Sequence, residues 1–366
     1  MDKVYENLND FNRAWTQTIE QRDKAIEDRK FVDIDGAQWD GACGDTFENK
    51  PKLVFDKITR EINRIIGEYS ANPISVNYLP DDEDSERAVA NILNDRFRSD
   101  ARRSDGQEAT DTAFQEAVKG GFGAFRLSAQ YEDEANPDFN KQFVRFDAIQ
   151  GADTVVIWDA NARKYDKSDA KQCWVMHEYT RHAFDKEYPD CAPFSGDQLP
   201  DFGNYEFDWF GDDIVYIAEC YEVKETFETR FVFESPTGEI IRFNKSELED
   251  EEVAIEVAEY EQLVTERVKV TKVMKSIICG DKFIEKPTVI AGDYIPVIPC
   301  YGYRSYIKGK EYYMGEVRKQ RDRQTFNNMA ISNLAEIMTE SQKEKDIFAP
   351  EQITPEIAKM WADNNV

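Results

Sequence analysis

The order of helical and strand patterns along the 366-residue chain predicts an α+β fold. Apolar residues at helical spacing dominate residues 1–121, short apolar runs dominate residues 122–300, and one long helical pattern follows at 314–343. Helices and strands are thus segregated instead of alternating, which is typical of the α+β class. We expect a helical part and a strand-rich part in one body, from which the long helix projects.

Four helices are expected in the first 121 residues, because apolar residues recur there three and four positions apart. They cover residues 3–30, 52–69, 85–99 and 106–119. Pro51 and Ser85 are favourable at the start of the second and third helix, and Gly120-Gly121 is favourable at the end of the fourth. Residues 31–50, rich in Asp and Gly, predict a loop, and the alternating run Ile74–Tyr78 predicts a strand. The apolar face of the third helix consists of Val89, Ile92, Leu93 and Phe97.

From Phe122 onward the pattern changes to strands bounded by turn residues. The expected strands cover 124–131, 143–146, 154–158, 172–176, 214–223, 226–233, 239–243, 264–273, 275–284 and 295–300. A short helix at 179–188, a connecting loop at 190–212 and an acidic helix at 247–261 interrupt them. The last two strands before 295 turn at Gly280-Asp281, and an aromatic hairpin over 301–313 leads into the long helix.

Composition indicates a folded protein with an acidic surface. Hydrophobic residues make up 41% and aromatic residues 13% of the chain, and no apolar run approaches the roughly 20 residues that cross a bilayer. Six widely separated cysteines and the lack of an apolar signal core at the N-terminus predict reduced thiols and a cytosolic origin. The net charge of −27 opposes tight binding to DNA phosphates, because affinity for them requires a basic surface.

Signals for catalysis are weak throughout the sequence. The two histidines, His177 and His182, are five residues apart, a spacing that would place them on different sides of a helix and rules out a shared metal there. Gly120–Gly123 follows a helix and precedes a strand, the reverse of the order in a phosphate-binding loop. We therefore expect no catalytic, cofactor or metal site.

Basic residues gather in one short region of this acidic chain, which we call the basic cluster. Its members are Arg304, Lys308, Lys310, Arg318, Lys319, Arg321 and Arg323. Only three acids lie among these seven residues, so the local charge is +4. The cluster is interpreted as a contact either with acidic faces of a neighbouring subunit, such as 247–252, or with DNA phosphates or a partner protein. Arg318 and Asp322, four residues apart, are expected to pair along the helix.

The long helix also carries an unpaired apolar stripe. Its members are Phe326, Met329, Ala330, Leu334, Ile337 and Met338. A lone helix cannot hide such a stripe, so we expect it to pack against other helices.

The most specific pattern is a spaced series that begins with the apolar strand Ile295–Cys300 and the hairpin Tyr301–Tyr313. It continues down the helix with Gly315, Arg318, Arg321-Asp322, Gln324, Asn327 and Ser332. This series resembles the passage from strand to stem helix in portal proteins of short-tailed (podovirus) bacteriophages. The likeness is strongest over 287–352 and weaker upstream.

The resemblance implies a phage portal fold: a wing over 1–300, helical over 1–121 and strand-rich over 122–300, a hairpin connection and stem helix over 301–344, and the start of a clip over 345–366. It implies a dodecameric ring at the portal vertex of the virion, made in the host cytoplasm. Double-stranded DNA would pass through this ring without sequence-specific binding. Terminase, capsid or scaffolding proteins and tail adaptor proteins are the implied partners, with no cofactor and no membrane.

Portal proteins continue through a second stem helix and a crown, so we expect the remainder of the protein to be absent from this chain. The residues themselves leave one alternative open, a non-viral acidic α/β scaffold or adaptor that binds a protein partner. An enzyme is a third reading.

Overall fold

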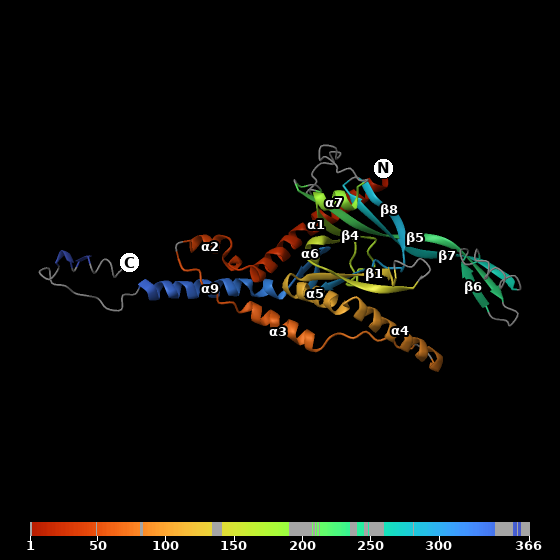
Figure 1. The fold of residues 1–366 in the computed structure, drawn as a ribbon, viewed down its shortest axis with the longest axis horizontal. Coiled ribbons are helices and arrows are strands. Elements are labelled where there is room, and N and C mark those ends of the chain that lie inside the picture. Colours follow the sequence, from red (N-terminus) through yellow and green to blue (C-terminus); the bar gives the residue numbers. More distant parts are fainter. Residues whose placement is uncertain are drawn as a thin grey trace.

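The computed structural model places helices and strands in one body with two projections (Figure 1). It describes the chain apart from the following residues: 1, 49, 81–82, 134–140, 190–206, 208, 210, 212, 235–239, 245–247, 249–259, 281, 341–353, 357 and 360–366. Most of the expected acidic helix at 247–261, of the loop at 190–212 and of the segment 345–366 therefore lies outside the described residues.

Two antiparallel sheets form the strand-rich part, as the α+β prediction requires. The larger sheet has the order β3-β4-β5-β7-β8, with β6 paired to β5, and the smaller has the order β2-β1-β9. The strands of the larger sheet are β3 (Val156–Trp158), β4 (Gln172–Thr180), β5 (Ile214–Glu234), β6 (Ile240–Asn244), β7 (Glu261–Cys279) and β8 (Lys282–Ile290). The strands of the smaller sheet are β1 (Phe122–Tyr131), β2 (Gln142–Ile149) and β9 (Val297–Tyr301).

The long helix α1 (Asp2–Asp33) runs along the body and confirms the prediction for 3–30. Its apolar side chains Leu8 and Phe11 are fully buried against Trp174 and Trp209, because the helix presents one apolar face to the larger sheet. A second core lies between the two sheets and includes Tyr221. Burial of these aromatic side chains holds α1 against the larger sheet, so other elements can pack against α1 as a fixed helix.

A network of ion pairs links the two sheets. Arg126 on β1 forms an ion pair with Glu219 on β5, and the Tyr221 hydroxyl donates to the same carboxylate at 2.8 Å. Lys275 and His177 lie 3.3 and 3.6 Å from Glu219. The Glu219 carboxylate is thus surrounded by cationic groups from both sheets.

Strands β5 and β7 extend beyond the body as an arm, visible at the right of Figure 1. The sequence predicted a break between 223 and 226 and another near 274, but β5 and β7 are each continuous and pair from Ala218 to Glu234. No turn residue interrupts these stretches, and cross-strand bonds along the pair stabilise the extended backbone. The expected turn at Gly280 and the hairpin partner at 239–243 are confirmed by β8 and β6.

Three more helices flank the smaller sheet: α3 (Ile58–Ala71), α4 (Glu83–Arg103) and α5 (Gly106–Lys119). Helix α5 agrees with the predicted 106–119 and ends at Gly120, as predicted. Helix α4 begins at Glu83, two residues before the expected Ser85 cap, so that part of the prediction is wrong. Short helices α6 (Ala152–Val155) and α7 (Arg181–Glu187) complete the body; α6 replaces the first part of the strand expected at 154–158.

Several local predictions between residues 31 and 78 are wrong. The expected loop 31–50 contains a 3-10 turn, η1 (Ala37–Trp39), and a short helix, α2 (Ala42–Thr46). Helix α3 begins at residue 58 instead of 52, because residues 51–57 are extended and bond to another helix. Residues 74–78 form no helix and pair with no strand among the described residues.

Helix α9 (Glu316–Glu340) is the second projection, and it agrees with the expected long helix up to the last residue described there. Its first turns lie in the body, where Val317 is fully buried with Phe31 and Ile58. Its distal part extends away from the sheets, opposite to the arm (Figure 1). The projection of this helix, expected from the sequence, is therefore confirmed.

Candidate functional site

The passage from the sheets into α9 is built on close backbone packing. Hairpin β10 (Tyr303–Ile307) and β11 (Lys310–Met314) confirms the expected connection and leads directly to Gly315. A Cβ atom on Gly315 would lie 2.0 Å from the carbonyl oxygen of Lys119 at the end of α5. Gly121 faces Met314 with a φ of 98°, a conformation that other residues rarely adopt. Helix α9 therefore begins so close to α5 that neither glycine position has space for a side chain.

Arg304, the first member of the basic cluster, bonds to other residues of the same chain. Its Nε pairs with Glu311 across the hairpin, and its Nη2 donates to the carbonyl oxygens of Arg163 and Lys164 at 2.9 and 3.1 Å. The guanidinium also lies over the Tyr301 ring, 4.9 Å from its centroid. With its donors engaged in this way, Arg304 fixes the hairpin to the loop at 163–164.

Arg318 and Arg321 bond to α1. Arg318 Nε lies 2.7 Å from Asp28 Oδ2, and Arg321 Nη1 lies 3.0 Å from Glu27 Oε2. Asp28 is only 1% exposed, and burial raises its pKa while the charge of Arg318 acts in the opposite direction. The expected pair between Arg318 and Asp322 is not formed, because Arg318 bonds to the buried carboxylate of Asp28 instead.

The four remaining members of the cluster, Lys308, Lys310, Lys319 and Arg323, are exposed. Lys319 places its Nζ 2.8 Å from the centroid of the Tyr303 ring. Arg323 has no ion-pair partner among the residues that the structure describes. The cluster therefore divides into three members that bond within the chain and four that present charge to solvent.

Three polar side chains that follow one another along α9, which we call the polar file, bond to the extended residues 51–57, which we call the strap. Gln324, Asn328 and Ser332 follow one another at intervals of four and are all buried. Ser332 Oγ accepts from the Leu53 amide at 3.0 Å, Asn328 Oδ1 from the Phe55 amide at 3.1 Å, and Gln324 Oε1 from the Lys57 amide at 3.1 Å. The strap is thus bonded to α9 in a defined register.

The spacing of this file has a geometric reason. Four residues of helix rise about 6.0 Å, and two residues of extended chain rise about 6.6 Å, so every second amide of the strap meets the next side chain of the file. Gln38 adds a further contact, because Asn328 Nδ2 donates to its Oε1 at 2.8 Å. One turn further, Lys50 Nζ pairs with Glu336 at 2.8 Å. Side chains of α9 thus replace the strand partner that the strap lacks.

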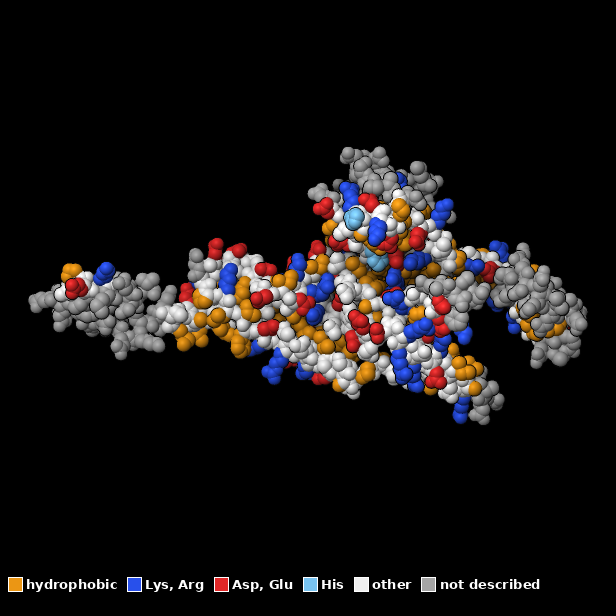
Figure 2. Space-filling view, in the orientation of Figure 1, with side chains coloured by type: hydrophobic (Ala, Val, Ile, Leu, Met, Phe, Trp, Pro, Cys, Tyr) orange, Lys and Arg blue, Asp and Glu red, His pale blue; other side chains and the backbone are white. Residues whose placement is uncertain are grey.

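The outer faces of the strap and of α9 are apolar and exposed. The exposed residues are Leu53, Val54, Phe55, Phe326, Leu334, Ile337 and Met338. Figure 2 shows orange side chains along the lower edge of this projection, with red and blue ones above them. The stripe predicted on the helix is present, and the residues that the structure describes leave most of it exposed.

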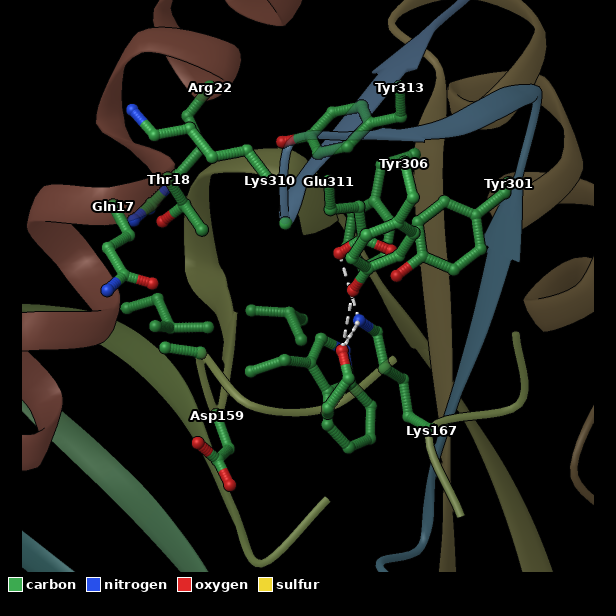
Figure 3. Close-up of a pocket in the computed structure, with 17 residues that line it drawn as sticks. Gln17, Thr18, Arg22, Asp159, Lys167, Tyr301, Tyr306, Lys310, Glu311 and Tyr313 are labelled. Carbon is green, nitrogen blue, oxygen red and sulfur yellow. Dashed lines mark hydrogen bonds and ion pairs between the residues drawn. The ribbon is translucent and has the colours of Figure 1, made fainter. Parts of the chain in front are cut away.

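A small cavity of about 80 Å³ lies between α1, β3 and the hairpin (Figure 3). Lys167 Nζ lies 2.9 Å from Glu311 Oε2 there, and it donates to the carbonyl oxygen of Ala162 at 3.1 Å. The hydroxyl of Tyr306 donates to the same oxygen at 2.8 Å. Burial lowers the pKa of Lys167, and the charge of Glu311 opposes this. These groups satisfy one another and brace the hairpin against the body.

Reactive groups elsewhere lie apart from this site. His177 is on β4 and His182 on α7, so the two do not share a helix. Burial raises the pKa of the Cys220 thiol to about 12, which keeps it protonated. Within the described residues, no group of three His, Cys, Asp or Glu side chains could hold a metal ion.

Comparison with known proteins identifies the family. A family model described as "Phage P22-like portal protein" matches residues 8–366. The chain belongs to the P22-like portal protein family. A "Portal protein" of Acyrthosiphon pisum secondary endosymbiont phage 1 is 34% identical over 364 residues, which cover 97% of this chain and 50% of that relative. The chain thus spans about half the length of this curated portal protein.

Membership of the portal family confirms the resemblance that the strand, hairpin and helix series suggested. No helix in the described part of this portal chain has the length and apolar content that crossing a membrane requires. Sequence reasoning missed the strap, Gln38 and the α1 carboxylates Glu27 and Asp28. The interval of four between Gln324, Asn328 and Ser332 was a usable signal for the strap, because three polar residues on one helix face need a polar partner.

Proposed function

We propose that this chain is a subunit of the portal vertex of a phage, where copies form a ring channel for genome packaging and ejection. The observation that carries the proposal is the family match over residues 8–366, nearly the whole chain. In this proposal the ring is dodecameric and lies in the virion, and the subunits are made in the host cytoplasm. Terminase, capsid or scaffolding proteins and tail adaptor proteins dock on it.

Helix α9 is the stem helix in this proposal, residues 1–300 form the wing, and residues 345–366 begin the clip. The exposed apolar side chains of α9 and the strap support this division, because a ring would cover them with the neighbouring subunits. The buried anchors at Asp28 and at the strap would hold each stem helix at a fixed angle to its wing.

Charge supports a passive role toward DNA. A net charge of −27 repels the phosphates of a duplex that must slide, so DNA passes without sequence-specific contacts. The exposed members of the basic cluster, Lys308, Lys310, Lys319 and Arg323, would then meet acidic surface on a neighbouring subunit. In this proposal the terminase carries out the catalysis, and the chain acts without a catalytic centre, cofactor or metal.

Mass measurement under native conditions tests the proposal. We expect the purified chain to sediment as a closed ring of about a dozen copies, and negative-stain electron microscopy to reveal rings with a central channel. Exclusive monomers at micromolar concentration would contradict it. Salt titration separates the two roles of the exposed cluster: contact between subunits predicts partial dissociation at high salt, whereas contact with DNA alone predicts an unchanged ring.

A further inference from the structure

Arg22 on α1 is a buried cation without an ion-pair partner among the described residues. It is only 4% exposed, and its two terminal nitrogens, Nη1 and Nη2, form no hydrogen bond with those residues. Its Nε donates to the backbone carbonyl oxygen of Asp153 at 3.0 Å. Burial lowers the pKa of Arg22 to about 10, so the guanidinium is still charged at neutral pH. Buried charges normally have a counter-ion and hydrogen-bond partners, and the described chain gives Arg22 neither at its terminal nitrogens.

The buried carboxylates around this arginine are paired with other cations. Asp153 Oδ1 lies 2.6 Å from Arg29 Nη2, although the backbone of Asp153 bonds to Arg22. On the opposite side, the carboxylate of Glu311 pairs with both Lys167 and Arg304. One carboxylate shared by two cations leaves an excess of positive charge near Arg22.

Arg22 lines the cavity between α1, β3 and the hairpin (Figure 3). The Tyr313 side chain, from β11, lines it too, and Figure 3 shows its hydroxyl turned toward Arg22 and Lys310. Tyr313 is 8% exposed, and its hydroxyl forms no hydrogen bond with the described residues. Burial raises the pKa of Tyr313, so the hydroxyl keeps its proton and can donate. The charged residues of the cavity wall are three cations and two acids: Arg22, Lys167, Lys310, Asp159 and Glu311.

The size of the cavity limits what it can hold. Its volume is about 80 Å³, and one water molecule needs roughly 10–15 Å³ measured in this way. The cavity therefore has room for several waters or for one ion with five heavy atoms, such as phosphate, and it is too small for a nucleotide. A guanidinium with free terminal nitrogens suits such an ion, because its parallel N–H groups match two oxygens of a phosphate.

We propose that this cavity is a binding site for one inorganic phosphate ion, with the guanidinium of Arg22 and the hydroxyl of Tyr313 as its donors. The ion is the counter-ion that Arg22 lacks within the described chain. Because the cavity lies between α1 and the hairpin that leads into α9, the bound ion joins these two elements. Phosphate therefore stabilises the connection between the body and the projecting helix, and the site belongs to the single chain.

Calorimetric titration of the purified chain with inorganic phosphate, in a chloride buffer, tests the site. We expect saturable binding of one phosphate per chain with a Kd below about 1 mM. Arg22→Met removes the charge but keeps a long side chain beside Trp15, and it should raise the Kd about a hundredfold or more. Arg13→Met is the matched control, because Arg13 lies on the same helix and is exposed. This control should bind phosphate like the wild type.

A second variant decides the question if Arg22→Met does not fold. Tyr313→Phe removes only the hydroxyl, and it should raise the Kd about fivefold to tenfold. Wild-type protein that binds no phosphate saturably would overturn the proposal, and so would wild-type affinity in Tyr313→Phe or in folded Arg22→Met. Phosphate also stabilises proteins in general by its exclusion from their surface. A rise in melting temperature that is equal in wild type and Arg22→Met would therefore count against the site.

Discussion

Asn328 on the projecting helix α9 accepts a hydrogen bond of 3.1 Å from the backbone amide of Phe55, 273 residues earlier in the chain. A side chain here takes the place of a strand partner. The side-chain nitrogen of Asn328 also forms a hydrogen bond, because Nδ2 donates to Gln38 Oε1. Both polar ends of one buried side chain therefore join α9 to the N-terminal part of the body.

Replacing Asn328 with leucine should destabilise the fold by about 2 kcal/mol, because the Phe55 amide would lose its partner and Gln38 Oε1 would lose one of its two donors. Urea unfolding measures the change in free energy. Hydrogen exchange should also become faster at the Phe55 amide. Asn333→Leu is the control, since Asn333 is exposed on the same helix and should change the stability by less than about 0.5 kcal/mol. Equal stability of both variants would show that the file does not hold the strap.

Removal of Arg318 should destabilise the chain by about 3 kcal/mol, because Asp28 is buried and would lose its nearest cation. Arg318→Ala can be compared with Arg323→Ala, whose side chain is exposed and without an ion-pair partner among the described residues. Thermal or urea unfolding of the two variants gives the difference. Glutamate at positions 318 and 321 should therefore impair folding of the subunit itself, before any effect on a ring.

Alanine at Gly315 should destabilise the junction of α5 and α9 by about 1–3 kcal/mol, since its Cβ would overlap the Lys119 carbonyl. Gly67→Ala provides a control of opposite sign. Gly67 lies within α3 with open space around it, so alanine there should stabilise by about 0.5–1 kcal/mol. A Gly315→Ala protein as stable as the wild type would mean that α9 can move away from α5 without cost.

Glu219 gives the fold a definite pH dependence. Burial alone would raise its pKa, but the contact with His177 and the charges of Arg126 and Lys275 outweigh burial and lower the pKa below the ordinary 4.5. A depressed pKa contributes stability that is present above the unfolded value and is lost as the pH falls through the folded value. The stability difference between wild type and Glu219→Gln should be largest near neutral pH and shrink below about pH 4.5. A constant difference across denaturation curves from neutral to acid pH would contradict this.

Elements with a strong local pattern were predictable from the sequence. Helices α1, α5 and α9 carry apolar residues at helical spacing or end at glycine, and the hairpin of β10 and β11 has clear turn residues between its strands. The strap was not predictable in this way, because its apolar residues Val54 and Ile58 continue the helical spacing of α3. Three backbone bonds to α9 outweigh that weak helical preference.

The basic residues of the candidate site could be predicted from the sequence, but their contacts could not. The sequence by itself determined the α+β class, the projecting helix, the charge of −27 with its basic cluster, and the likeness to portal proteins, because each depends on residue order alone. Only the tertiary structure decided which basic side chains are already bonded, since Asp28 and Glu27 lie about 290 residues from their arginines in sequence. It also decided that Val89, Ile92 and Leu93 on the apolar face of α4 are exposed. Periodicity records that a face is apolar, but what covers the face depends on distant elements and on neighbouring chains.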